Sequence, residues 1–277
     1  MLQPTPPLEE TVDEHQENHV DEQQEQSYHL HSINSTIAIR LLPSQGLSFQ
    51  LWPAASALVT LLDNHRRGQT TALSALLPNE RRLRLLELGP PPDTPRRGQT
   101  TALSALLPNE RRLRLLELGS GTGLVGIAAA ALLGARVTLT DLPHVLPNLQ
   151  FNVDSNAGIL ELHWGAVEVA ALPWGDIQQM EAVGRDEYDV ILGSDVVYHD
   201  HLYEPLLETL KFFLLGSEKK SVFLMAHLKR WKKESAFFKK AKRLFDVEII
   251  HRDSPIDGSR VGVAVYKFVK RGSPIEL

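Results

Sequence analysis

Along most of the chain, short apolar runs alternate with longer segments in which apolar residues recur at helical spacing. Five runs have the length of buried strands, at residues 113–118, 136–141, 158–164, 189–195 and 221–227. Helical segments lie between or after them, at residues 127–133, 144–156, 201–215 and 234–245. Strands that alternate with helices are typical of an α/β fold, in which a parallel sheet carries helices on both faces.

The two ends of this pattern differ from its centre. Residues 33–39 and 47–52 are short β-type runs around a Pro/Gly turn, which predicts an N-terminal β-hairpin. A helix should follow from Pro53, a residue favoured at the first helical position. The last two runs, 247–251 and 261–269, are joined by a loop too short for a crossover, so this pair should be antiparallel. We expect a mostly parallel, seven-stranded sheet with an antiparallel C-terminal strand.

The first 27 residues carry eight acidic side chains and no Lys or Arg. Such a segment buries too little apolar surface to offset its ordering entropy. We therefore expect a disordered acidic tail over residues 1–27 and one domain over residues 28–277.

A 24-residue segment occurs twice without a change, as residues 66–89 and 96–119. Solenoid repeats diverge and occur in three or more copies, so this duplication does not indicate a repeat fold. The first copy runs into Pro90-Pro91-Pro92, which cannot begin the glycine loop and helix that follow the second copy. We assign the central strand to the second copy and expect an insertion displaced to the surface at about residues 66–95.

Composition excludes several kinds of chemistry. The chain has no cysteine, which excludes disulfides, cysteine-based zinc sites and thiol catalysis. Its net charge of −5 provides no general attraction for nucleic acid, and no apolar run reaches the roughly 18 residues of a membrane span. We expect a soluble monomer of the cytoplasm, with the nucleus as a second compartment, and no membrane partner.

The central strand leads into three alternating glycines, in Gly119-Ser120-Gly121-Thr122-Gly123, and then into an Ala-rich helix. Such a turn presents backbone N–H groups and the positive end of a helix to a nucleotide-like ligand. Residues 121–126 match the dinucleotide pattern G-x-G-x-x-G, but there the first glycine should follow the strand at once. The register that begins at Gly119, preceded by the acidic Glu117, resembles the S-adenosylmethionine (AdoMet) loop of class I methyltransferases.

Two further candidates end predicted strands, where ligands of open α/β sheets bind. Asp141 lies 18 residues after Gly123 and suits a carboxylate that accepts hydrogen bonds from both ribose hydroxyls. A helix N-cap is the alternative role for Asp141. Trp164 ends the predicted third strand, where its ring would pack on adenine or belong to the core.

The segment Asp195-Val196-Val197-Tyr198 follows the predicted fourth strand, directly after Ser194. Together with Trp52 and the loop at residues 117–123, this Asp-x-x-Tyr segment resembles the methyltransferase-like family of seven-strand protein-lysine methyltransferases. Members of that family methylate Hsp-type chaperones, an AAA ATPase (valosin-containing protein), calmodulin and elongation factors. The resemblance covers about residues 33–269 and implies a Rossmann-like class I fold that uses AdoMet.

By this resemblance, the chain is an AdoMet-dependent protein-lysine N-methyltransferase. Asp195 would attract and orient the lysine amine, and Tyr198 would shape the pocket; for Asp195 alone, a helix cap is the alternative. The glycine loop, the predicted strand ends and the resemblance together suggest cofactor-binding roles for Trp52, Glu117, Gly119, Ser120, Gly121, Thr122, Gly123, Asp141, Trp164 and Ser194. Methyl transfer is an in-line displacement that needs a neutral, oriented amine in a desolvated pocket and no metal. A small-molecule methyltransferase and a catalytically inactive binding protein of the same fold are the alternatives.

Two polar clusters have no role in this scheme. His199 and His201 flank Asp200, but no further ligand set accompanies them, so we favour a solvated helix start over a metal site. The basic run at residues 229–243 could contact RNA or an acidic protein. Its aromatic residues are expected in the core, and a solvated helix face is the simpler interpretation.

Overall fold

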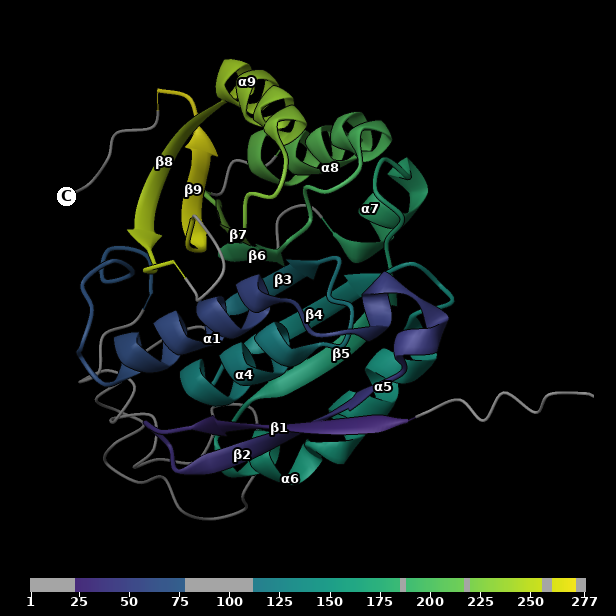
Figure 1. Cartoon of the computed structure of the whole chain (residues 1–277), viewed down its shortest axis with the longest axis vertical. Helices are drawn as coiled ribbons and strands as arrows, with labels where there is room; N and C mark the ends of the chain where they lie inside the picture. Colours follow the sequence, from purple (N-terminus) through teal and green to yellow (C-terminus); the bar gives the residue numbers. More distant parts are fainter. Residues whose placement is uncertain (1–22, 78–111, 185–187, 217–219, 256–260, 273–277) are drawn as a thin grey trace, which may run out of the picture.

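The computed structural model describes residues 23–77, 112–184, 188–216, 220–255 and 261–272 (Figure 1). The strands of its main sheet are β3 (Arg114–Leu118), β4 (Arg136–Asp141), β5 (Ala166–Ala171), β6 (Val190–Ser194), β7 (Val222–His227), β8 (Phe245–Arg252) and β9 (Ala264–Lys270). They follow the order β5-β4-β3-β6-β7-β9-β8. The strands from β3 to β7 are parallel, whereas β9 pairs antiparallel with both β7 and β8. The predicted sheet is confirmed.

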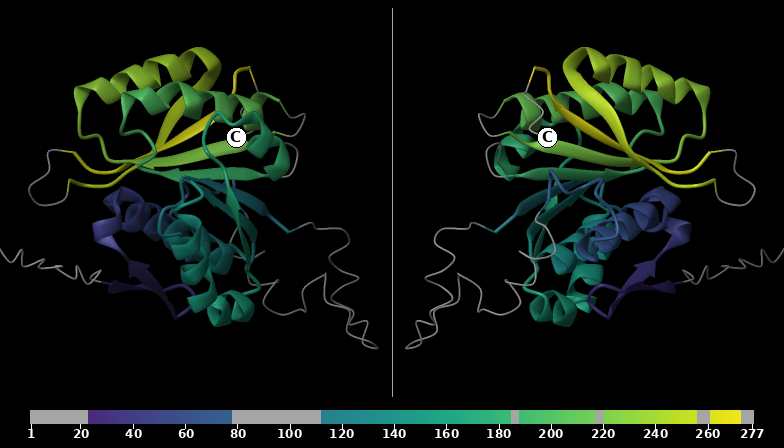
Figure 2. Two further views of the ribbon diagram at one scale, coloured as in Figure 1. Left: turned by 90° about the vertical axis from the view of Figure 1, so that its right-hand side faces the viewer. Right: turned by 90° about the vertical axis from the view of Figure 1, so that its left-hand side faces the viewer.

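Helices cover both faces of this sheet (Figure 2). They are α1 (Pro53–Arg66), α4 (Leu124–Leu133), α5 (Leu146–Ser155), α6 (Ala157–Leu162), α7 (Ile177–Val183), α8 (Tyr203–Leu215) and α9 (Ser235–Leu244). Successive residues of a strand point to opposite faces of the sheet. Leu115 packs in the core with α1 and α4, and Leu116 packs in the core with α8 and α9. None of the helices in the described part of the chain is long and apolar enough to cross a membrane.

The N-terminal hairpin differs from the prediction. It pairs β1 (Gln24–Leu30) with β2 (Ser35–Leu41), so residues 24–27 lie in a strand and not in the predicted tail. The predicted second strand at residues 47–52 is wrong: Leu47–Phe49 is a turn of 3-10 helix that leads to the confirmed start of α1 at Pro53. The sequence pattern did not predict β1 as a strand, because most of its side chains are exposed and it has no apolar run. Residues 1–22 lie outside the described residues.

The hairpin is fixed to the domain by Asn152 of α5 and by Asn156, which lies between α5 and α6. Asn152 accepts a hydrogen bond from the Arg40 amide at 2.8 Å, and Asn156 accepts one from the Ala38 amide at 3.0 Å. Both asparagines also donate to carbonyl groups of β2. These pairs satisfy edge groups of β2 that would otherwise lack a partner.

The predicted third strand at residues 158–164 is also wrong. That segment forms α6, with only Leu160 buried, and the third strand of the sheet is β5. Gly165 lies between α6 and β5. A side chain does not fit there, because a Cβ would lie 2.8 Å from the backbone of Ala130. As a result, Trp164 precedes the strand and lies near Gly134, at the amino edge of the sheet rather than the carboxyl edge.

The duplicated segment contributes to the domain from both of its copies. Strand β3 belongs to the second copy, as predicted. Residues 66–77 of the first copy are not a displaced insertion, however, because Leu73 is fully buried and the Arg66 guanidinium donates to the Leu132 carbonyl at 2.6 Å. Residues 78–111 lie outside the described residues.

Candidate functional site

A cavity of about 340 Å³ opens at the carboxyl ends of β3, β4, β5 and β6. Most of the site residues predicted from the sequence line it, namely Trp52, Gly119, Ser120, Gly121, Thr122, Asp141, Ser194, Asp195 and Tyr198. Glu117, Gly123 and Trp164 do not line the cavity. The carboxyl ends of the parallel strands and the start of α1 therefore bring together residues that are more than 140 positions apart in the chain.

Two glycines of the loop have no room for a side chain. Gly119 and Gly121 adopt φ angles of +63° and +56°, which L-residues rarely adopt. A Cβ on Gly121 would lie 3.0 Å from the Ser48 carbonyl oxygen, and one on Gly119 would lie 2.9 Å from the ring of Trp174. Ser48 and Trp174 thus lie close to the loop, and we call this narrow space beside the loop backbone the glycine cradle; it opens to the cavity.

Asp141 closes one end of the cradle. Its Oδ2 accepts a hydrogen bond from the Gly121 amide at 2.8 Å, and its Oδ1 accepts one from the Leu142 amide at 2.7 Å. Burial raises the pKa of Asp141, whereas these two amides oppose that change. A carboxylate has about four acceptor positions, so Asp141 can still accept hydrogen bonds from two hydroxyl groups of a ligand.

Glu117 lies beneath the loop and is fully buried. Its Oε2 accepts a hydrogen bond from the Gly126 amide at 2.9 Å, and its Oε1 has no hydrogen-bond partner in the structure. Burial raises the pKa of Glu117 to about 8. In this position, Glu117 joins β3 to the first turn of α4 and does not reach the cavity wall.

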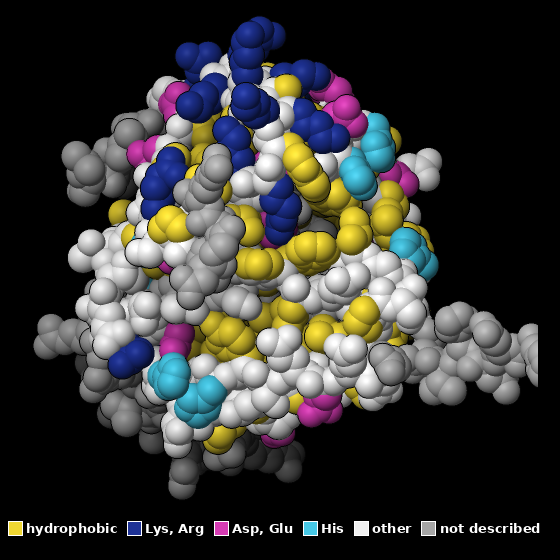
Figure 3. All heavy atoms as spheres, in the orientation of Figure 1, with side chains coloured by type: hydrophobic (Ala, Val, Ile, Leu, Met, Phe, Trp, Pro, Cys, Tyr) yellow, Lys and Arg dark blue, Asp and Glu magenta, His cyan; other side chains and the backbone are white. Residues whose placement is uncertain are grey.

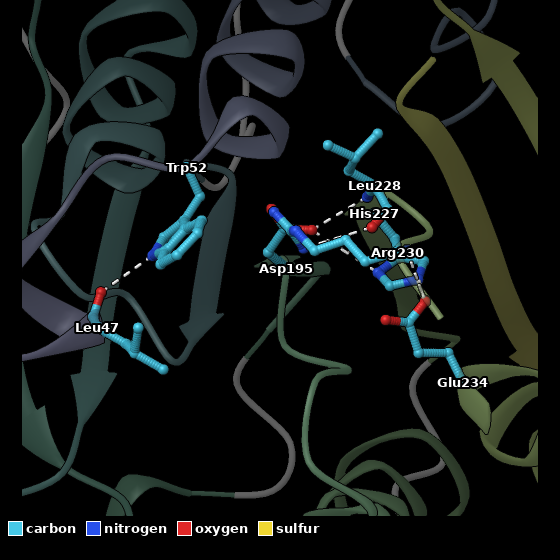
Figure 4. A network of polar contacts seen from close by, with 7 residues as sticks. All are labelled: Leu47, Trp52, Asp195, His227, Leu228, Arg230 and Glu234. Atoms are coloured by element: carbon cyan, nitrogen blue, oxygen red, sulfur yellow. Dashed lines mark hydrogen bonds and ion pairs between the residues drawn. The ribbon is translucent and has the colours of Figure 1, made fainter. Parts of the chain in front are cut away.

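Asp195 lines the cavity after β6, on the other side of β3 from Asp141, and is 8% exposed. Its Oδ1 accepts a hydrogen bond from the Leu228 amide at 3.0 Å, and its Oδ2 forms an ion pair with Arg230 at 2.8 Å (Figure 4). The Arg230 guanidinium lies 5.2 Å from the centre of the Trp52 ring. Arg230 thus lies between Asp195 and Trp52, on the cavity wall.

Behind Asp195, two further buried groups complete a polar network. His227 Nδ1 is 3.7 Å from Asp195 Oδ1, and His227 Nε2 is 3.2 Å from Glu234 Oε2. Glu234 Oε2 also accepts a hydrogen bond from the Arg230 amide at 3.1 Å. Burial lowers the pKa of His227, although both carboxylates act in the opposite direction.

Aromatic side chains form the rest of the wall. Tyr198 is partly buried, and this burial raises the pKa of its hydroxyl, with a smaller contribution from the charge of Asp141. Trp174, which follows β5, lines the cavity beside the glycine loop, whereas Trp164, which was expected to end the third strand and pack on adenine or in the core, does not line the cavity. The sequence analysis did not single out Trp174, because Trp174 follows β5, a segment that was not predicted as a strand.

Arg230 and His227 were also missed as site residues, although His227 ends the predicted fifth strand at the same edge of the sheet.

The two histidines near the cavity, His199 and His201, stack with ring centres 5.4 Å apart. Within the described ranges, no three His, Cys, Asp or Glu residues have the arrangement of a metal site.

The parallel sheet, its antiparallel C-terminal strands and the glycine loop at its carboxyl edge define a class I methyltransferase fold. Among solved structures, the chain is similar to the T. thermophilus 16S rRNA N2 G1207 methyltransferase RsmC in complex with AdoMet and guanosine, with a TM-score of 0.50 and 16% identity. The match covers 90% of this chain and 51% of that chain, and at this identity it supports the fold alone.

Comparison with known protein families identifies a more specific class than the fold does. A family model described as lysine methyltransferase matches residues 32–244, and the chain belongs to this family. It is 38% identical over 158 residues to protein N-lysine methyltransferase METTL21A of Danio rerio, a match that covers 57% of this chain and 66% of that protein. It is 36% identical over 135 residues to EEF1A lysine methyltransferase 3 of Xenopus tropicalis, covering 48% of this chain and 56% of that protein. The matches span somewhat less than two thirds of these relatives.

Proposed function

We propose that this protein is an AdoMet-dependent protein-lysine N-methyltransferase. The observation that carries the proposal is one cavity lined by two chemically distinct groups of residues. The glycine cradle and Asp141, which suit a nucleoside, follow β3 and β4, and Asp195 and Tyr198, which suit an amine, follow β6. Membership of the lysine methyltransferase family supports the same assignment.

The residues present fit the cofactor. The free acceptor positions of Asp141 suit ribose hydroxyls, and the open backbone at Gly119 and Gly121 leaves room that a Cβ would fill. The Trp174 ring beside the loop offers a flat apolar surface. When bound, AdoMet would supply an electrophilic methyl group on its sulfonium, and transfer of that methyl group to a neutral amine would release S-adenosylhomocysteine.

After β6, the carboxylate of Asp195 attracts the ammonium group of a lysine. Because Arg230 and the Leu228 amide already occupy its two oxygens, Asp195 is held in one orientation and its charge is partly neutralised. Such a carboxylate guides the amine without holding it as a tight ion pair, which would disfavour the neutral form. The rings of Trp52 and Tyr198 exclude water from this part of the cavity.

The proposed methyl acceptor is a lysine of another protein. Relatives at 36–39% identity are named as protein N-lysine methyltransferases, and one is named for EEF1A. Among the substrate classes implied by the family resemblance, the elongation factor is therefore the first candidate, ahead of chaperones, AAA ATPases and calmodulin.

The test uses the full chain with isotopically labelled AdoMet and a pool of purified proteins, with the modified residue mapped by mass spectrometry. We expect label on lysine, and we expect Asp195→Asn to lower kcat by about a hundredfold while AdoMet still binds. Asp154→Asn, an exposed change on α5, is the control and should leave kcat unchanged.

Three results would contradict the proposal. Label confined to small molecules would indicate a small-molecule methyltransferase. AdoMet binding without any transfer of label would indicate an inactive binding protein. An unchanged kcat for Asp195→Asn would remove Asp195 from the reaction.

A further inference from the structure

One side of the cavity mouth is strongly basic. Arg230 and Trp231 line the cavity, and Lys229, Lys232 and Lys233 flank them in the same segment with exposed side chains. Trp231 is 50% exposed although it is large and apolar. We refer to Lys229, Trp231, Lys232 and Lys233 as the basic rim.

The charges of the basic rim are not neutralised by the nearby acidic groups. Asp195 is engaged by Arg230, and Glu234 is buried against His227. In the part of the chain that the structure describes, no carboxylate pairs with the three rim lysines, and Lys233 Nζ instead lies 5.8 Å from the centre of the Trp231 ring. A chain with a net charge of −5 thus presents unneutralised cations beside its cavity.

The positive surface continues beyond the rim onto α9. Lys239, Lys242 and Arg243 are exposed there, and Lys240 forms an ion pair with Glu204. Figure 3 shows Lys and Arg side chains gathered at the top of the molecule, where α9 lies. Residues 229–243 include eight basic residues and one acidic residue, so the local field is positive.

We propose that the basic rim docks an acidic segment of the substrate protein beside the lysine that enters the cavity. This inference rests on the proposed function and specifies its substrate class. A lysine ammonium that approaches alone is repelled by the three rim lysines, whereas flanking carboxylates convert this repulsion into attraction. The exposed Trp231 ring adds an apolar anchor of the kind that concentrates binding energy in protein interfaces.

The features of the rim favour a protein over a nucleic acid. Single-strand binding surfaces stack successive bases on several exposed aromatic rings. Here Phe237 and Phe245 are buried, and Trp231 is the exposed aromatic side chain of the segment. The negative charge of the whole chain also opposes a long polyanion more than it opposes a short acidic segment.

The test measures binding to the full chain by fluorescence anisotropy, in the presence of S-adenosylhomocysteine. The probes are a short labelled peptide with one central lysine and Glu at the flanking positions, the same peptide with Gln in place of Glu, and a labelled single-stranded RNA. We expect the Glu peptide to bind at least about tenfold more tightly than the Gln peptide. Its affinity should fall steeply as salt is raised, because exposed charges are screened.

The rim variant is Lys229→Glu/Lys232→Glu, and its matched control is Lys220→Glu/Lys270→Glu. The control lysines are exposed and lie at the opposite edge of the sheet, and both variants change the net charge equally. We expect the rim variant to lose the preference for the Glu peptide and the control to keep it. An equal effect of both variants would overturn the inference, since only the total charge would then matter.

Two other outcomes would also overturn the inference: equal affinity for the Glu and Gln peptides, and tighter binding of RNA that is lost in the rim variant. Methyl transfer is read separately on the same peptides and proteins. If the rim selects the Glu peptide but no lysine is ever methylated, docking stands and the proposed function fails. If lysine is methylated with no effect of the rim variant on KM or peptide affinity, the proposed function stands and this inference fails.

Discussion

At the scale of single residues, the backbone of Asp195 is unusual. Its φ angle of +53° is uncommon for a residue other than glycine and costs on the order of 1–2 kcal/mol. Strain of this kind persists only where surrounding contacts hold it, here the Leu228 amide and Arg230. The strained turn directs the carboxylate to the cavity wall immediately after β6, which is consistent with the proposed role of Asp195.

Glu117 gives a prediction about pH. Burial raises its pKa from 4.5 to about 8, so its contribution to stability is fully present below about pH 4.5 and is lost as pH rises to about 8. The loss is at most about 5 kcal/mol. Glu117→Gln keeps an acceptor for the Gly126 amide but cannot ionise, so its melting temperature should fall less between pH 5 and pH 8 than that of the wild type. If the melting temperatures of Glu117→Gln and the wild type fell equally between pH 5 and pH 8, the raised pKa of Glu117 would be contradicted.

Gly121 gives a prediction about the cofactor. Gly121→Ala places a Cβ 3.0 Å from the Ser48 carbonyl at a φ angle of +56°, so the loop must shift and AdoMet affinity should fall by about tenfold or more. The matched control is Gly158→Ala on α6, where a Cβ meets nothing within 4 Å. The control should keep its affinity and gain about 0.5–1 kcal/mol of stability. Calorimetric titration with AdoMet separates the two, and equal affinities would show that the cradle tolerates a side chain.

At the scale of elements, the structure explains where sequence patterns misled. Residues 158–164, which were assigned to the third strand, carry larger apolar side chains than β5, which consists of Ala, Val and Glu. In the fold, α6 uses Leu160 alone to contact the core, while β5 is an edge strand whose side chains are mostly half-buried. An edge strand needs little apolar surface, so its sequence carries a weak signal.

The duplicated segment gives a prediction at the same scale. The described parts of the two copies, residues 66–77 and 112–119, supply different portions of one 24-residue unit. Because the copies are identical, removing residues 66–95 and removing residues 78–107 yield the same sequence. This shortened chain should bind AdoMet with unchanged affinity and unfold at the same or a higher temperature, with a gain of at most about 2 kcal/mol from the shorter connection.

The measurement is a thermal melt and an AdoMet titration of the shortened chain beside the full chain. A shortened chain that fails to fold would show that both copies are required. A gain of AdoMet binding in the shortened chain alone would show that the additional residues disable the site.

At the scale of the whole molecule, the distribution of charge matters more than its sum. The net charge of −5 indicated no general attraction for nucleic acid, and a solvated helix face was favoured for residues 229–243 over contact with RNA or an acidic protein. The fold places the basic run beside the cavity mouth, where its field acts on whatever enters. The proposed docking of an acidic segment follows from that position, and the rim variants test it.

The sequence by itself determined the sheet class, the central strand, the glycine loop and the pair Asp195 and Tyr198. These features depend on local periodicity and on motifs within a few residues, which the backbone obeys wherever the segment lies. Only the tertiary structure decided that Trp174 and not Trp164 lines the cavity, that residues 24–30 form a strand, and that Arg230 and His227 lie beside Asp195. Such contacts join segments that are distant in the chain, and their energy depends on packing and burial that no single segment encodes.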